Sequence, residues 1–349
     1  MAKVIDLRSD TLTSPDAGMR AAMQEAPVGD DVFGEDTSII ALEAKMAKAC
    51  GKEKALFVPS GTMGNLICAL IHGEGLFSEI IMGSEAHTAN WEAGGASVLG
   101  RVFVRQVQNN ADGTLPLDKL EGNIQYPNIH NGITRAIFLE NTQNACGGAV
   151  LPMEYVNQVR AICDKNKIIL HCDGARAWNA AVALGIEISD VLKPFDTASL
   201  CLSKGLGAPV GSIVVGSAAF IDKARHVRKM LGGGMRQAGI VAQGANYAFD
   251  NLYGRMKEDH ANATLLGKLL SEGTSFKVVT PQSNIVVFTV AVDDATRDKF
   301  VDACAADNVK VVAWKQTGSV RAVAYYGITT ADIEEVAARM IKISKSLGL

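Results

Sequence analysis

The chain has 349 residues, of which 48% are hydrophobic and 20% are charged, and its net charge is −3. This composition is typical of a globular protein of one or two domains, without the basic runs of a nucleic-acid or membrane-surface binder. No apolar run reaches the roughly 18 residues that span a bilayer, and we expect no signal peptide. Seven cysteines without a CxxC pair predict free thiols in a reducing, cytoplasmic compartment and no metal site.

From about residue 50 to 250 the pattern alternates between short apolar runs and helices. A helix with Ile39, Leu42 and Met46 on one face is expected to begin behind Asp36 and to end at Gly51. Another is expected to open at Pro152. Several apolar runs are almost continuously hydrophobic, as strands covered on both faces should be. The predicted strands are 54–58, 79–82, 101–104, 135–140, 167–173 and 211–216.

This alternation predicts an α/β fold with a mostly parallel sheet between helices. After residue 250 the pattern changes to a polar helix over about 251–272, a strand at 284–292 and a helix over about 293–307. Strands near 309–314 and 320–326 and a final helix over about 330–346 follow. We therefore predict a large domain over residues 1–250, which includes the N-terminal segment, and a smaller C-terminal α+β domain over 251–349.

Asp173 and Lys204 each follow an apolar run, at predicted strand ends. In an open α/β sheet, ligands bind outside the carboxyl ends of the strands. A lysine and an acid in this position suit pyridoxal phosphate, where the lysine binds the cofactor covalently and the acid pairs with the pyridine nitrogen. Desolvation favours the neutral, nucleophilic amine. A structural ion pair between the two side chains is the alternative.

The segment FVPSGTMGN (57–65) runs from a predicted strand into a helix. Free N–H groups at a helix start can bind a phosphate, with Gly61 allowing close approach and Thr62 beside it. A plain helix cap at Ser60 explains the same residues. No Walker A loop or GxGxxG fingerprint occurs.

His87 follows another predicted strand and could stack on a cofactor ring, although a lone histidine is more often structural. Arg176 and Arg321 could clamp a substrate carboxylate between the domains, or form surface ion pairs. None of these signals is decisive alone. Their order along the chain favours a pyridoxal phosphate enzyme of the aspartate-aminotransferase fold group, fold type I.

With these residues in hand, the chain resembles the L-threonine aldolase family almost from end to end. Three segments carry the most specific part of the resemblance: HCDGARAWNA (171–180), LSKGLGAPVGS (202–212) and KMLGGGMRQAG (229–239). Others are IDLRSDTLT (5–13), GDDVFGEDTS (29–38), SGTMGN (60–65), EAHTANWEAGG (85–95) and LENTQN (139–144).

The resemblance implies a lyase that cleaves L-threonine, L-allo-threonine and related β-hydroxy-α-amino acids to glycine and an aldehyde, with pyridoxal 5′-phosphate as cofactor. Lys204 would bind the cofactor covalently, Asp173 would hold its ring nitrogen, and His87 would stack on the ring. It further implies phosphate binding by Gly61 and Thr62 and carboxylate binding by Ser9, Arg176 and Arg321, with Arg176 also near the cofactor. His130 would lie near the substrate β-hydroxyl.

Family members are dimers or dimers of dimers, so the resemblance also implies a homodimer or homotetramer with shared sites. Arg236 and Lys229 would reach the phosphate from a neighbouring subunit. The base that removes the β-hydroxyl proton could be His87, His130 or an ordered water, and the sequence leaves these three open.

This sequence departs from the family pattern at three places. Phe33 stands where the family usually has tyrosine, Asn131-Gly132 follows His130 in place of an aromatic residue and proline, and VAYYGIT follows Arg321. We interpret these changes as bearing on substrate preference, with phenylserine as a candidate. A β-eliminating lyase and a non-catalytic cofactor sensor are the alternatives to an aldolase.

Overall fold

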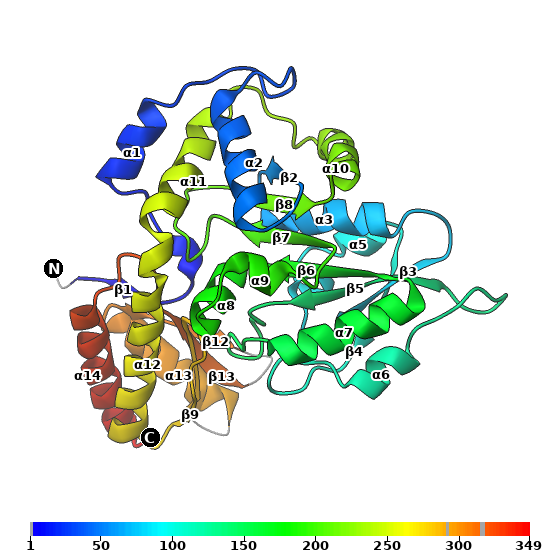
Figure 1. The fold of residues 1–349 in the computed structure, drawn as a ribbon. Coiled ribbons are helices and arrows are strands. Elements are labelled where there is room, and N and C mark those ends of the chain that lie inside the picture. Colours follow the sequence, from blue (N-terminus) through cyan, green and yellow to red (C-terminus); the bar gives the residue numbers. More distant parts are fainter. Residues whose placement is uncertain (1–2, 291–292, 315–317) are drawn as a thin grey trace.

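The computed structural model describes residues 3–290, 293–314 and 318–349. Within them, a central sheet of seven strands has the order β2-β8-β7-β6-β5-β3-β4 (Figure 1). Its strands are β2 (Lys54–Val58), β3 (Ser78–Gly83), β4 (Phe103–Val107), β5 (Ile133–Glu140), β6 (Ile169–Gly174), β7 (Thr197–Cys201) and β8 (Ser212–Gly216). From β4 to β7 neighbours are parallel, whereas β8 is antiparallel to β7 and β2. The predicted α/β fold with a mostly parallel sheet is confirmed.

Helices cover both faces of this sheet. Neighbouring residues of one strand pack into different cores: Phe57 belongs to the core that contains Leu42 and Val156, and Leu56 to the core that contains Ile67. The first core takes in α1 (Ala17–Gln24), α2 (Thr37–Ala49), α7 (Met153–Asn166), α8 (Ala177–Leu184), α9 (Ile188–Leu192) and α11 (Gly239–Asn251). The second takes in α3 (Gly61–His72), α5 (Gly95–Val98) and α10 (Ala218–Met230). Burial on both faces explains why most of these strands are continuously hydrophobic.

A smaller α+β layer lies at the lower left of Figure 1. Its antiparallel sheet has the order β12-β13-β10-β9. The elements are α12 (Met256–Gly273), β9 (Lys277–Val279), β10 (Ile285–Thr289), α13 (Asp294–Ala306), β11 (Val309–Lys310), β12 (Val312–Trp314), β13 (Ser319–Val323) and α14 (Thr330–Leu347). The predicted strand at 284–292 corresponds to β10, and residues 291–292 lie outside the described part.

The N-terminal segment contributes to this smaller layer. Strand β1 (Ile5–Asp6) pairs in parallel with β11, and Ile5 and Leu7 are buried in the same core as Phe288 and Val336. The chain therefore begins in the smaller layer and crosses to the large one through the 3-10 turn η1 (Asp10–Leu12). The sequence pattern did not indicate this crossing, and the division at residue 250 stays a prediction.

Strand β4 occupies residues 103–107 where 101–104 was predicted. Strand β4 lies at the edge of the sheet, and most of its residues are exposed or half-buried. Its hydrophobic run is therefore short, and the sequence pattern placed the strand too early in the chain. The remaining short elements are α4 (His87–Asn90), α6 (Leu117–Gly122) and η2 (Tyr253–Arg255).

The sheet brings three strand ends to one edge. Strands β5, β6 and β7 are parallel, so Glu140, Asp173 and Cys201 lie at neighbouring carboxyl ends. The link from β7 to β8 covers only residues 202–211, too short for a crossover helix, so β8 returns antiparallel. This hairpin link carries Lys204 and places it at the same edge as Asp173.

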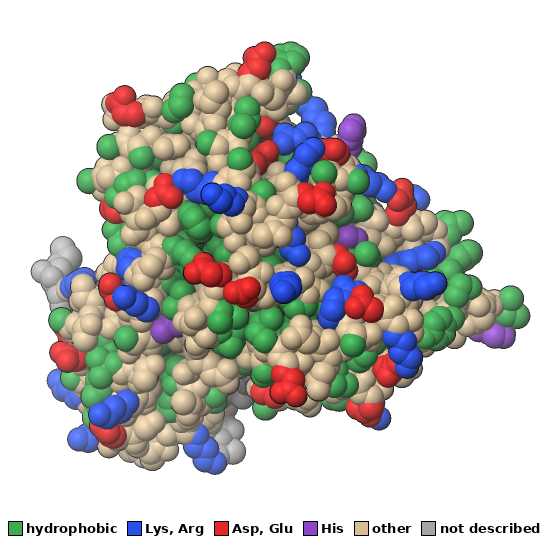
Figure 2. Space-filling model, viewed as in Figure 1, with side chains coloured by type: hydrophobic (Ala, Val, Ile, Leu, Met, Phe, Trp, Pro, Cys, Tyr) green, Lys and Arg blue, Asp and Glu red, His purple; other side chains and the backbone are tan. Residues whose placement is uncertain are grey.

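The surface carries charges of both signs. Figure 2 shows lysine and arginine interspersed with aspartate and glutamate over the visible face. Among the helices of the described residues, none has both the length and the apolar character required to cross a membrane.

Candidate active site

A cavity of about 350 Å³ opens at the carboxyl edge of the central sheet. Its walls include Lys204, Asp173, His87 and the start of α3 at Gly61 and Thr62. These side chains come from four separate parts of the chain. The arrangement brings together five of the residues that sequence analysis assigned to a cofactor, whereas Arg176, Lys229 and Arg236 do not line this cavity.

Lys204 is half-buried in the turn after β7. Across the described ranges, its ammonium group has no hydrogen-bond or ion-pair partner, so the structural Asp173–Lys204 ion pair is not formed. Its backbone carbonyl accepts a hydrogen bond from the Gly207 amide at 2.8 Å, which fixes the turn. The amine is thus held at the cavity wall with its nitrogen free to react.

The start of α3 presents unused backbone donors to the cavity. The Ser60 hydroxyl accepts from the Met63 amide at 3.2 Å, which caps the helix and leaves the amides of Gly61 and Thr62 at its open end. A Cβ on Gly61 would lie 2.8 Å from the Cys201 sulfur. Glycine is therefore required for the helix start to approach the end of β7, next to Lys204.

Asp173 is 3% exposed and receives three hydrogen bonds. Its Oδ2 accepts from Asn65 Nδ2 at 3.0 Å and from the Thr88 hydroxyl at 2.9 Å. Its Oδ1 accepts from the Ala175 amide at 3.3 Å. These donors hold the carboxylate in one orientation at the cavity wall.

His87 and Glu92 form a second polar group beside Asp173. The ring Nδ1 of His87 lies 3.1 Å from Glu92 Oε1, and the same oxygen accepts from Asn65 Nδ2 at 2.9 Å. The backbone amide of His87 donates to Glu140 Oε2 at 2.7 Å. Burial, together with the Asp173 charge, raises the pKa of Glu140 to about 7. His87 is thus anchored at both its backbone and its ring.

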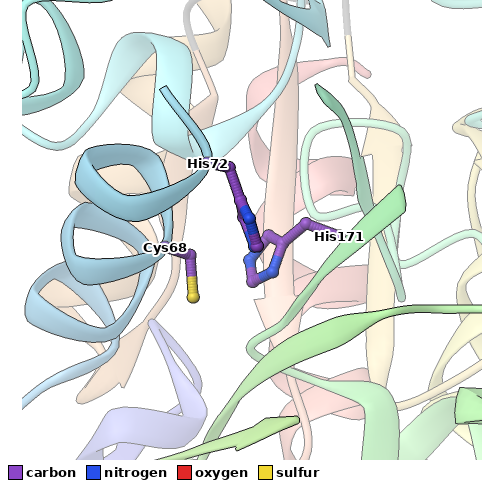
Figure 3. Close-up of side chains that lie close together, drawn as sticks. All are labelled: Cys68, His72 and His171. Carbon is purple, nitrogen blue, oxygen red and sulfur yellow. The ribbon is translucent and has the colours of Figure 1, made fainter. Parts of the chain in front are cut away.

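Two neighbouring imidazoles, of the half-buried His72 and the buried His171, lie next to Asn65, and Figure 3 shows these two side chains with Cys68. His171 Nε2 lies 3.5 Å from Asn65 Oδ1, and His171 Nδ1 and His72 Nε2 lie 2.9 and 2.8 Å from the Thr197 hydroxyl. Burial lowers the pKa of His72 to about 4 and that of His171 well below its usual range. The Cys68 sulfur lies within 4.8 Å of a nitrogen of each ring. Both imidazoles are neutral and hydrogen-bonded, so we assign them a structural role.

A second cavity of about 300 Å³ adjoins the first and shares His87, Lys204 and Thr11 with it. Ser9, Arg176 and Arg321 line this second cavity. The three residues predicted to bind a carboxylate therefore meet beside the lysine.

The two arginines are bound differently. Arg176 donates to both oxygens of the buried Asp10, from Nε and Nη2, at 2.8 Å each. Nη1 of Arg176 and Nη1 of Arg321 both donate to Asn144 Oδ1, at 3.2 and 2.8 Å. One neutral oxygen therefore separates two guanidinium groups.

The charged side chains of this second cavity do not balance one another. Burial would raise the pKa of Asp10, but the Arg176 guanidinium lowers it to about 2. Burial, with the Arg176 charge nearby, lowers the pKa of Arg321 to about 10. The Arg321 guanidinium lies 4.3 Å from the centre of the Trp314 ring. Asp10 compensates Arg176, which leaves Arg321 as the cation that favours an incoming anion.

Three predicted site residues lie elsewhere in the single chain. His130 is exposed and lines a separate surface cavity with Phe77 and Phe103. Lys229 and Arg236 are exposed, and Arg236 Nη1 donates to Asp30 at 2.9 Å. Phe33 is 74% exposed and lines neither of the two site cavities.

Sequence reasoning missed several residues that hold the site together: Asp10, Asn65, Thr88, Glu92 and Asn144. All five are buried polar side chains. They lie in or beside the segments that suggested the site, such as SGTMGN and LENTQN, but no local pattern predicts which distant group each one contacts. A polar residue amid the small and apolar residues of a predicted buried helix, as Asn65 is, was the available signal.

The Asp10–Arg176 pair predicts a specific pH dependence of stability. The folded-state pKa of Asp10, about 2, is below its ordinary value of 3.8, so the pair stabilises above about pH 4 and loses this contribution as the pH falls toward 2. Asp10→Asn should lower the free energy of unfolding by about 2 kcal/mol at pH 7.

Urea unfolding at several pH values, down to the lowest at which the wild type stays folded, measures this difference. The difference in free energy of unfolding between wild type and Asp10→Asn should become smaller below about pH 4. Asp222→Asn, in the exposed pair with Lys54, serves as control and should change stability by less than about 0.5 kcal/mol. A difference that stays constant with pH would contradict the assignment.

Comparisons with known proteins agree with this geometry. Residues 6–293 match the model of the beta-eliminating lyase family. The chain is 42% identical to the low specificity L-threonine aldolase of Escherichia coli K12 over 335 residues, 96% of this chain and 98% of that one. It is 41% identical to low-specificity L-threonine aldolase 1 of Arabidopsis thaliana, with 94% and 93% of the two chains covered.

Among solved structures, the threonine aldolase of Leishmania major superimposes with a TM-score of 0.80 at 17% identity, over 97% of this chain and 98% of that one. This likeness supports the fold. The match to the relatives over almost the whole length shows that the chain belongs to the low-specificity L-threonine aldolase family, within the beta-eliminating lyases.

Proposed function

We propose that this protein is an aldehyde-lyase that cleaves L-threonine, L-allo-threonine and related β-hydroxy-α-amino acids to glycine and an aldehyde, with pyridoxal 5′-phosphate as cofactor. One observation carries the proposal. The cavity with Lys204 and Asp173 adjoins the cavity with Arg321, and both share the lysine. A cofactor and an amino-acid carboxylate can therefore be bound side by side.

The residues present fit the cofactor chemically. The open amides of Gly61 and Thr62 suit its phosphate, the unpaired Lys204 amine suits its aldehyde, and the buried Asp173 carboxylate suits a protonated ring nitrogen. The phosphate donors and the carboxylate lie on the walls of the same cavity. When bound, the cofactor withdraws the electron pair of the broken Cα–Cβ bond.

The chain itself supplies orientation and proton transfer. Arg321 and the Ser9 hydroxyl bind the substrate carboxylate, which can replace Asn144 Oδ1 as the shared acceptor of the Arg176 and Arg321 guanidinium groups. Fixing the carboxylate fixes the bond at Cα that is broken. His87 lines both cavities, which supports a role for it in handling the β-hydroxyl proton.

We further propose that the active form is a homodimer or homotetramer in which each site is completed by a neighbouring subunit. Lys229 and Arg236 are exposed in the single chain, and residues 125–132 project from the sheet at the right of Figure 1. His130, on this projection, would then act on a neighbour's substrate. Seven free cysteines, six of them buried, support a reducing, cytoplasmic compartment.

Product analysis tests the activity. Purified protein with added cofactor should convert L-threonine to glycine and acetaldehyde, measured by alcohol-dehydrogenase coupling and amino-acid analysis. Keto acid and ammonia instead of glycine would identify a β-eliminating lyase, and tight cofactor binding without products would identify a sensor. Comparison with phenylserine tests the effect of the family departures, and a clear preference for threonine counts against a phenylserine aldolase.

Lys204→Ala removes the amine that binds the cofactor. We expect it to lose the visible absorbance of covalently attached cofactor and nearly all turnover, on the order of a 10³-fold fall or more. Lys193→Ala, at an exposed lysine, is the matched control and should retain both. An active Lys204→Ala protein with unchanged absorbance would refute the assignment.

Mixed oligomers test whether sites are shared. If Arg236 acts on a neighbour, a dimer of one Lys204→Ala and one Arg236→Ala chain contains one intact site, in which Lys204 and Arg236 come from different chains. Random mixing should then restore about a quarter of wild-type activity, because half the dimers are mixed and each has one intact site of two. Mixing that restores nothing would show that Arg236 does not act across subunits.

A further inference from the structure

His87 and Glu92 form a pair in which the histidine lines both cavities, whereas Glu92 lines only the first. The ring Nδ1 lies 3.1 Å from Glu92 Oε1. The His87 side chain is 33% exposed and the Glu92 side chain 4%. The second ring nitrogen, Nε2, is therefore the one left to face a substrate.

The Asn65 amide determines which protons this pair can hold. Its oxygen lies 3.5 Å from His171 Nε2, and its nitrogen lies 3.0 Å from Asp173 Oδ2 and 2.9 Å from Glu92 Oε1. An ionised carboxylate only accepts hydrogen bonds. The amide is thus oriented with one N–H to each carboxylate, and Glu92 Oε1 is an acceptor toward both Asn65 and His87.

The tautomer of His87 follows. Imidazole is a stronger base than a carboxylate, so the proton between them stays on Nδ1. Neutral His87 then carries its lone pair on Nε2, on the side of the cavities.

We propose that Glu92 is the positioning residue that makes His87 the base for the β-hydroxyl proton. This inference rests on the proposed aldol cleavage and selects one of the three candidate bases. The β-hydroxyl O–H bond breaks and an Nε2–H bond forms on His87. The O–H electron pair becomes the second bond of the aldehyde carbonyl while the Cα–Cβ bond breaks toward the cofactor. The proton then leaves His87 for solvent through the open cavity.

Charges around His87 set the pH range of this role. The hydrogen bond to Glu92 raises the pKa of His87, Asp173 acts in the same direction, and the Lys204 charge opposes them. Glu140 accepts from the His87 backbone amide. A base must be unprotonated, so activity should rise as the pH passes upward through the raised pKa of His87.

The test is Glu92→Gln in the cofactor-loaded enzyme, with Glu85→Gln from the same segment as control. Glutamine keeps the size of glutamate but removes the charge that fixes Nδ1–H. We expect kcat to fall roughly 10- to 100-fold. The low-pH limb of kcat/KM should move to lower pH, because the imidazolium has lost its carboxylate. Glu85→Gln should leave both unchanged.

A double-mutant cycle distinguishes positioning from general structural damage. If Glu92 acts through His87, adding Glu92→Gln to His87→Gln should cost less than about twofold further. If Glu92→Gln lowers activity by the same factor in the wild type and in His87→Gln, the proposal is overturned.

Imidazole NMR gives a readout that is independent of turnover. With ¹⁵N-histidine labelling and His87→Gln for assignment, wild-type His87 should show a protonated Nδ1 and a raised pKa. Glu92→Gln should lower that pKa by about one unit. If the titration of His87 and kcat are both unchanged in Glu92→Gln, the inference is overturned. Cleavage of threonine by the wild type would still support the proposed function in that case.

Discussion

The whole site depends on supplying hydrogen-bond donors to two carboxylates in the interior of the protein. Asp173 and Glu92 are both buried, and a buried carboxylate without donors is costly. Burial raises the pKa of Glu92, and its hydrogen bonds with His87 and Asn65 oppose that rise. One amide resolves this conflict, since the Asn65 nitrogen donates one hydrogen to each carboxylate. Thr88 and the Ala175 amide add further donors to Asp173. Without them neither acid could serve as a fixed negative partner for a cofactor ring or for His87.

The orientation of Asn65 extends to the imidazoles behind it. With the Asn65 oxygen as acceptor, neutral His171 donates to it from Nε2 and accepts from the Thr197 hydroxyl at Nδ1, so that this hydroxyl accepts from Nε2 of neutral His72. The low pKa values of both histidines allow only one N–H on each ring. The two histidines shown in Figure 3 thus complete the hydrogen bonding of an amide that the two carboxylates orient. A positive charge on either imidazole would disturb this order, and burial prevents it.

Sequence alone was sufficient for the sheet and for the residues with distinctive chemistry. The runs at 54–58 and 135–140 are hydrophobic on both faces because helices cover both, so the pattern located β2 and β5 to within two residues. The antiparallel direction of β8 was not predicted, although the structure explains it, because ten residues between β7 and β8 leave no room for a crossover. The parallel pairing of β1 with β11 could not be predicted from the sequence, because strands of two residues have no periodicity.

The supporting residues of the site are harder to predict for a physical reason. Asn284 and Asp10 are 274 positions apart, yet the amide donates to the carboxylate at 3.2 Å. Arg176 was predicted to meet a substrate carboxylate, and the structure shows that a protein carboxylate, Asp10, already occupies its fork. Residue type indicates that a buried charge needs a partner, but only the fold determines which partner it finds.

The pairing of Arg176 with Asp10 bears directly on how a substrate carboxylate is distinguished from other groups in the proposed function. If both guanidinium groups were unpaired, they would repel each other and hold any anion strongly. Asp10 neutralises Arg176, and the Asn144 oxygen, which carries no charge, is the only acceptor the two arginines share among the described residues. Among the described residues, Arg321 and Lys204 are then the basic side chains of this cavity that have no carboxylate partner. An incoming carboxylate can replace this oxygen, balance Arg321 and accept from both arginines. Its second oxygen is then available to the Ser9 hydroxyl, which lines the same cavity. In the proposed function, selectivity for amino acids therefore depends on the Arg321 guanidinium group, which lines the same cavity as the Lys204 amine.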